Sequence, residues 1–179
     1  MWELERYDWA KLRSATSAKD VPTSIMWLKN ADSAENAEKA YWRIDNEVVV
    51  QGSLYEAALP TATCLVLALQ DCTESARPRI IELLVQLGSG EASPIEIAAG
   101  NAELKRLCMV ELCRGASAYF AATEIAAADW VYLCVDVLSI CVDVDQGLKP
   151  RVAWYFNRLL SRNVHPDVRR LIEDCLSKS

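Results

Sequence analysis

The sequence predicts an all-α protein. Apolar residues make up 52% of the 179-residue chain, and they recur at helical spacing in segments separated by short polar or glycine-containing connections. No segment shows the two-residue alternation of a half-buried strand, and the valines at 48–50 are too short a run to build a sheet. We therefore expect a single all-helical domain over residues 1–179.

The N-terminal part is expected to hold three helices. The first covers about residues 3–15, where apolar side chains alternate with charges. The second begins near Pro22, because proline is favoured in the first turn of a helix. The third follows a cap at Asp32 or Ser33, whose side-chain oxygens can accept a hydrogen bond from a free backbone N–H.

Two S-x-x-E patterns predict further helix starts. Ser53 with Glu56, and Ser93 with Glu96, have the spacing of a capping box, in which the two side chains satisfy each other's backbone N–H groups. Pro60 removes the backbone bond to Glu56, so the helix after Ser53 is expected to kink or restart. The remaining helices are expected over about residues 75–87, 102–123, 124–145, from Pro150 and from Pro166.

The stretch from Glu124 to Asp145 is predicted to be the central helix. It is apolar on nearly every side, and its interruptions Asp129, Asp136 and Asp143 lie seven residues apart, so they form one acidic line. These carboxylates argue against a membrane span, because a charge costs roughly 2.5 kcal/mol or more at the bilayer centre. The line is expected to face water or a partner.

A second interpretation of this acidic line is internal. Three arginines share one face of the next helix, at positions 151, 158 and 162. Antiparallel packing would place them opposite the aspartates as an ion-pair ladder. The sequence leaves both interpretations open.

The charge distribution is uneven. The net charge is −6 and the pI about 4.9, which disfavours direct nucleic-acid binding. Neither the span between Arg43 and Arg77 nor that between Arg114 and Lys149 contains a Lys or Arg, and together they hold ten acidic residues. An acidic field on a neutral-to-basic frame is typical of a surface that meets a basic partner.

Other functional signals are few. The seven cysteines form no CxxC pair and His165 is the single histidine, so we expect no metal site and no cofactor. The N-terminus carries no apolar secretory core, and we expect a cytoplasmic protein without membrane insertion. Phosphate-loop, dinucleotide, nucleophile-elbow and zinc-protease motifs are absent, which predicts a protein that is not an enzyme.

Segment length favours a repeat architecture. Helices of about 10 to 20 residues, taken as successive pairs, give a period near 40 residues, the size of a HEAT or armadillo unit. We therefore predict a HEAT-like solenoid of helical pairs, with a compact multi-helix bundle as the alternative.

A sequence resemblance supports this prediction. Pro22, the run AYWRID at 40–45 and QGSLYEAALPTA at 51–62 form a connected pattern over roughly the first 90 residues. The pattern resembles bacterial HEAT-like repeat proteins, in which a Trp-bearing helix is followed by a His-Gln-Gly-x-x-Tyr-Glu-Ala-type turn and an apolar helix. Val50 stands where that family often has His.

Together with the acidity and the lack of catalytic motifs, this resemblance implies an immunity protein of the kind paired with contact-dependent growth-inhibition toxins. Its partner would be a cognate toxin domain, basic and of nuclease type, held through the acidic surface. The residues expected to bind it are Trp42, Asp45, Glu47, Tyr55, Glu56, Asp71, Glu74, Asp129, Asp136 and Asp143. A non-enzymatic helical-repeat scaffold and a carboxylate-based hydrolase are the alternatives.

Overall fold

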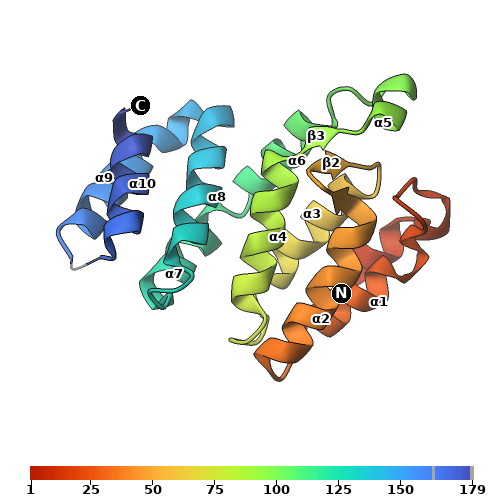
Figure 1. The fold of residues 1–179 in the computed structure, drawn as a ribbon, viewed down its shortest axis with the longest axis horizontal. Coiled ribbons are helices and arrows are strands. Elements are labelled where there is room, and N and C mark those ends of the chain that lie inside the picture. The colour runs from red at the N-terminus through yellow and green to blue at the C-terminus, as the bar shows by residue number, and fades with distance from the viewer. Residues whose placement is uncertain (163, 178–179) are drawn as a thin grey trace.

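The computed structural model describes residues 1–162 and 164–177, and it is mostly helical, as predicted (Figure 1). Within these residues the α-helices are α1 (Val21–Lys29), α2 (Ala34–Val48), α3 (Ala58–Ala68), α4 (Arg77–Ser89), α5 (Pro94–Ala98), α6 (Leu104–Cys113), α7 (Ala116–Ile125), α8 (Val131–Val144), α9 (Lys149–Leu160) and α10 (Pro166–Ser177). None of the described helices is long and apolar enough to span a bilayer.

The helices lie in two rows. One row runs through α1, α3 and α6, and the other through α2, α4, α8 and α10, with each helix touching the next in its row. The rows also contact each other, as α1 does α2 and α3 does α4. The chain therefore advances from α1 and α2 at one end of the molecule to α9 and α10 at the other (Figure 1).

One apolar core joins the rows. Its buried side chains extend along the sequence from Leu4 to Ile172, and most of the cysteines belong to it. None of the seven cysteines forms a disulfide within the described residues, and five of them are buried. A buried thiol behaves as a small hydrophobic side chain.

The N-terminal segment is not the α-helix expected over residues 3–15. It forms the short 3₁₀ helices η1 (Trp2–Arg6), η2 (Trp9–Lys11) and η3 (Ala18–Asp20) instead. Trp9 is buried, and its indole N–H donates to the carbonyl of Leu4 at 2.7 Å. This non-helical contact and the packing of η1 on α3 fix the segment against the core.

A small three-stranded sheet corrects the prediction that this region contains no strand. β1 (Val49–Val50) pairs antiparallel with β2 (Ser53–Leu54), and β2 pairs in parallel with β3 (Glu91–Ala92). The turn residues Gln51 and Gly52 have φ values of 51° and 77°, as a two-residue hairpin turn of type I′ requires. The partner strand β3 lies some forty positions away, so local periodicity carried no signal for it.

The predicted helix caps form at Ser33 and Ser93 but not at Ser53. The Ser33 and Ser93 hydroxyl oxygens accept hydrogen bonds from the N–H groups of Asn36 and Glu96, at 3.3 and 3.4 Å, as expected. The reciprocal half of the box at Ser93 is not formed, because the Glu96 carboxylate binds Arg13 and Asn101 and the Ser93 N–H donates to Leu54. The capping box at Ser53 is wrong, because Ser53 lies in β2 and α3 begins only at Ala58. Pro60 consequently lies in the first turn of α3, where a proline is tolerated without a kink.

Two glycines leave room for a neighbouring side chain, Gly88 between two helices and Gly115 at the start of α7. Gly88 lies inside α4 rather than ending it, and a Cβ there would be 2.8 Å from a methyl group of Leu112 in α6. A Cβ on Gly115 would lie 2.5 Å from the hydroxyl of Tyr119, which is itself fully buried. At Gly115 the helix expected over residues 102–123 breaks into α6 and α7.

The predicted central helix over residues 124–145 is also wrong. Residues 116–125 form α7, a connection follows, and α8 begins at Val131. Ala126 is extended, so the chain turns back and α7 packs against α8. The α8 helix still occupies a central position, because it contacts α4, α6, α7, α9 and α10.

Candidate protein-binding surface

Asp45 lies on the face of α2 that is turned toward α4. Its carboxylate accepts a hydrogen bond from Tyr41 and lies close enough to Glu82 of α4 to feel its charge. Burial raises the pKa of Asp45, and the negative charge of Glu82 raises it further, against the hydrogen bond. Arg79 is the basic residue at this point: it pairs with Glu82 at 2.6 Å and with Glu38 at 3.4 Å.

Asp129 lies at the next position along the same surface. It lines a pocket of about 260 Å³ that also includes Arg79, Glu82 and the half-exposed ring of Tyr132. Asp129 is exposed, in the turn before α8. The fold thus brings together Asp45 and Asp129, which are 84 positions apart in the sequence, around Glu82 of α4.

Asp136 lies within α8, seven positions after Asp129. It is half-buried, and no side-chain hydrogen bond or ion pair reaches it from the described residues. Burial alone raises the pKa of Asp136 to about 6. A partly desolvated carboxylate without a counterion is costly in the free protein, and a cation brought by a partner would relieve that cost.

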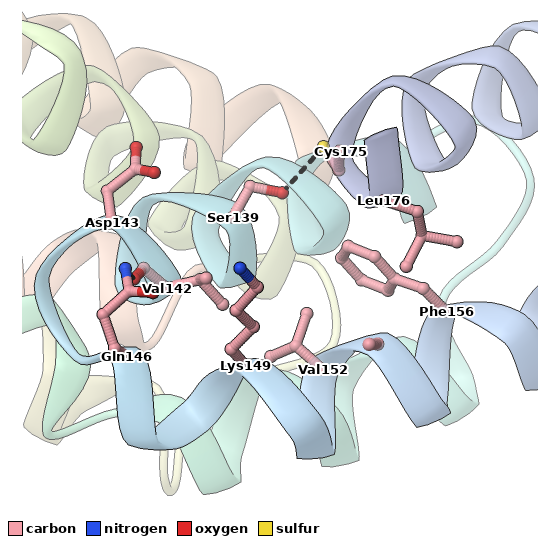
Figure 2. A pocket seen from close by; sticks show the side chains of 10 residues that line it. Ser139, Val142, Asp143, Gln146, Lys149, Val152, Phe156, Cys175 and Leu176 are labelled. Carbon is pink, nitrogen blue, oxygen red and sulfur yellow. Dashed lines mark hydrogen bonds between the residues drawn. The ribbon is translucent and has the colours of Figure 1, made fainter. Parts of the chain in front are cut away.

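Asp143, two helical turns further, is exposed beside a different pocket. This pocket of about 180 Å³ lies where α8, α9 and α10 meet (Figure 2). Val152, Phe156 and Leu176 line it, the ammonium group of Lys149 points into it, and Ser139 lies 3.0 Å from the sulfur of Cys175 (Figure 2). Among the described residues that line this pocket, Asp143 is the one acidic side chain.

The internal ion-pair ladder is not formed. Arg158 and Arg162 of α9 both bind Glu124 at the end of α7, at 2.5 and 3.0 Å. Hydrogen bonds from Tyr155, Arg162 and Arg158 lower the pKa of Glu124 to about 2. Arg151 stacks over the ring of Phe120, with its guanidinium carbon 4.3 Å from the ring centre. In the part of the chain described, Asp129, Asp136 and Asp143 have no ion-pair partner.

Three other predicted binding residues are engaged inside the molecule. Glu47 accepts hydrogen bonds from Ser14, Thr16 and Ser17, which tie the N-terminal segment to α2. Glu56 binds Arg13 at 3.2 Å, and Asp71 binds Lys29 at 2.9 Å. The carboxylates of Glu47 and Glu56 therefore join separate segments of the fold. The carboxylate of Asp71 is exposed.

The remaining predicted residues are dispersed. Trp42 is 48% exposed and lines a shallow pocket on the side of α2 that faces α1, with Arg43 and Lys19. Tyr55 is half-buried between β2 and α3. Glu74 is exposed next to Ser75, which lines the pocket of Asp129. Of these three, only Glu74 lies beside the acidic surface.

We call the surface formed by Asp45, Glu82, Asp129 and Asp136 the α2/α4/α8 acidic surface. Glu82 was not among the predicted residues, because it lies in a segment that also contains Arg77 and Arg79 and so has no net acidity. Its position on a helix could nevertheless be predicted from the sequence, since the buried Ile81 and Leu84 flank it at helical spacing.

The described residues hold no group of three or more His, Cys, Asp or Glu side chains placed to bind a metal ion. His165 is exposed, and its Nδ1 accepts a hydrogen bond from the N–H of Asp167 at 3.3 Å, which serves the start of α10. Comparison with protein families, curated proteins and solved structures found no match to this chain.

Proposed function

We propose that this chain is an immunity protein that binds and neutralises a cognate toxin domain in the cytoplasm through the α2/α4/α8 acidic surface. The observation that carries the proposal is the state of Asp129, in the turn before α8, and Asp136, within α8, which have no counterion among the described residues. A toxin that acts on nucleic acid must present a basic site to its polyanionic substrate. Unpaired carboxylates on a rigid frame would occupy that site.

The architecture fits this role. We interpret the two rows of helices as a HEAT-like solenoid in which α1 with α2, α3 with α4, α6 and α7 with α8, and α9 with α10 form four successive units. In such a solenoid one row offers a continuous surface, and here the row with α2, α4 and α8 carries Asp45 and Asp136, which make no ion pair among the described residues, and Glu82, which is paired with Arg79. Fixed helices keep these charges in place, so that binding requires little ordering of the surface.

The experiment is co-expression with the basic nuclease-type toxin domain encoded next to this gene, followed by measurement of binding. We expect growth to be rescued, and the association rate to fall steeply as salt is raised, because long-range attraction between opposite charges is screened. A complex that forms equally well at high and low salt, or no protection at all, contradicts the proposal.

Asp129→Asn and Asp136→Asn test the surface itself. Each should weaken the complex, Asp129→Asn by roughly two- to fivefold, as expected for an exposed ion pair, and Asp136→Asn by more, because its site is partly desolvated. Glu5→Gln is the matched control: it also removes one exposed charge, but from η1, on the α3 side of the molecule. Equal losses in all three variants would mean that net charge, not this surface, governs binding.

A helical-repeat scaffold is the alternative that the two-row arrangement also fits. A scaffold would bind its partners without inhibiting any of them. The two functions separate in the rescue assay, since a scaffold gives a complex in which the toxin stays active.

A further inference from the structure

A groove of opposite charge crosses α7. Two pockets, of about 410 and 350 Å³, adjoin along this helix and share Ser117 and Ala121 as lining residues. Both shared residues are exposed and small, one helical turn apart, and so form a low floor between two walls. The ends of α3 and α6 and the start of α4 make one wall, and α9 makes the other. We call this feature the α7 groove.

Arg77 lies in the first wall, and its guanidinium has hydrogen-bond donors that are not fully used. Its Nε is buried and has no hydrogen-bond partner, and its Nη1 makes only a long bond of 3.5 Å to the carbonyl of Leu69. A buried donor without an acceptor is destabilising, and an acceptor brought by a ligand would remove that cost. Gln70 and the mostly exposed Arg114 line the same pocket, and Arg114 is paired with Glu111 at 2.6 Å.

The second wall combines an exposed aromatic ring with arginines. Trp154 is 63% exposed, and Arg151 stacks on Phe120 without a carboxylate partner among the described residues. Glu124 is the one acidic residue of the lining, and Tyr155, Arg158 and Arg162 already occupy its oxygens. Glu124 therefore does not neutralise the positive charges of Arg77 and Arg151.

The groove therefore carries positive charge, whereas the whole chain carries negative charge. Four arginines and one glutamate line the two pockets, in a protein of net charge −6. The start of α7 at Ala116 adds to this, because the first N–H groups of a helix have no partner within it and carry partial positive charge. An anionic group is the ligand that this combination fits.

We propose that the α7 groove binds an acidic peptide segment of a partner protein, with carboxylates on Arg77 and Arg151 and an apolar side chain on Trp154. Arginine forks match carboxylate geometry, and an exposed tryptophan beside arginines is the usual composition of a binding hot spot. A nucleic acid fits less well, because it needs a row of cations along its phosphates, and of the arginines that line the groove among the described residues two, Arg77 and Arg151, lack an ion pair. This surface is separate from the α2/α4/α8 acidic surface and does not depend on the immunity proposal.

The test uses the whole protein and a fluorescein-labelled peptide of six glutamates around a central phenylalanine. Binding is followed by fluorescence anisotropy, with the same peptide carrying glutamine for glutamate, and with single-stranded oligothymidylate, as competing probes. We expect the acidic peptide to bind, the glutamine peptide to bind at least roughly tenfold more weakly, and the oligonucleotide not to compete.

Arg151→Gln and Trp154→Ala are the main variants, because both side chains are exposed and the fold does not rest on them. Each should lower peptide affinity by roughly tenfold. Arg106→Gln is the matched control, an exposed arginine on α6 outside both pockets, and it should leave affinity unchanged. For Arg77, the Nε–Hε resonance in a ¹⁵N spectrum should shift when the peptide is added, and not when the glutamine peptide is.

Three results would overturn the proposal. The first is a peptide affinity that is the same in Arg151→Gln, Trp154→Ala and Arg106→Gln. The second is tighter binding of oligothymidylate than of the peptide, which would assign the groove to nucleic acid. The third is concentration-dependent self-association that Arg151→Gln abolishes, which would make a second copy of this chain the occupant.

Discussion

Arg13 holds Glu96 through two hydrogen bonds, from its Nε and Nη2 atoms to the two carboxylate oxygens at 3.0 and 2.8 Å. The pair joins the N-terminal segment to α5, 83 positions away. Glu96 is fully buried, and Asn101 and the N–H of Glu56 also donate to it. Because Arg13 also binds Glu56, one guanidinium fixes three separate segments of the chain.

Arg13→Gln should therefore destabilise the protein by about 2–3 kcal/mol, because it leaves a buried carboxylate without its cation. The measurement is urea unfolding at pH 7. In the double variant with Glu96→Gln the loss should be smaller than the sum of the two single losses, since the unpaired charge is gone. Strict additivity would mean that the pair is not coupled.

Acid should weaken the fold through carboxylates whose pKa is lowered in the native state. Glu124 is one of these, with a pKa of about 2 against an ordinary 4.5. Its ionised form stabilises the native state above about pH 4.5, and this contribution is lost as the pH falls toward 2. Glu124→Gln should reduce the slope of unfolding midpoint against pH in that window. An unchanged slope would show that Glu124 keeps the same pKa after unfolding.

Asp136 should behave in the opposite way. Burial raises its native pKa from 3.8 to about 6, so the native state binds a proton more readily than the unfolded chain between these values. The ionised, partly buried Asp136 carboxylate lowers the stability of the native state. This loss is absent below about pH 3.8 and fully present above about pH 6. Asp136→Asn should stabilise the protein at pH 7 by about 1–2 kcal/mol and have little effect at pH 3.5, in thermal unfolding.

This variant also separates stability from binding. If the α2/α4/α8 acidic surface is the binding surface, Asp136→Asn gives a protein that is more stable at pH 7 yet weaker in complex formation. A loss of binding in that variant cannot then be attributed to unfolding. A variant that is both less stable and unaffected in binding contradicts the role given to Asp136.

Gly115→Ala should destabilise the junction of α6 and α7. The added methyl group would lie 2.5 Å from the hydroxyl of Tyr119 and 2.7 Å from its ring carbon, and the buried ring has no room to withdraw. Overpacking of this kind costs about 1–3 kcal/mol. The control is Ser117→Ala, on the exposed side of the same helix, which should leave the melting temperature almost unchanged. A melting temperature unchanged by Gly115→Ala would mean that the junction can open.

The helix starts show how far local sequence determines this protein. Pro22, Ser33, Ser93, Pro150 and Pro166 each stand at or just before an observed helix N-terminus, as predicted. These signals are readable because a cap or a fixed proline angle acts within three or four residues. The helical class, the buried cysteines and the approximate positions of most helices follow from such short-range effects and from apolar spacing.

Longer-range relationships were decided only by packing. Glu56 and Glu96 have the spacing of capping-box residues, yet both bind Arg13, because the tertiary fold brings a guanidinium to them. The chain breaks at Gly115 and after Ile125, although apolar spacing continues through both. There the contacts of Tyr119 and Glu124 with other segments outweigh the preference for a continuous helix.

The same distinction holds for the candidate surfaces. The sequence by itself determined that acids gather in two spans and that Asp129, Asp136 and Asp143 recur at helical spacing. Only the tertiary structure decided which of them stay unpaired, because pairing depends on how neighbouring helices are rotated and on which side chains reach across. It turned Arg158 and Arg162 of α9 toward Glu124 and left the aspartates of α8 without an ion-pair partner among the described residues. It also built the α7 groove from α3, α4, α6, α7 and α9, which share no motif.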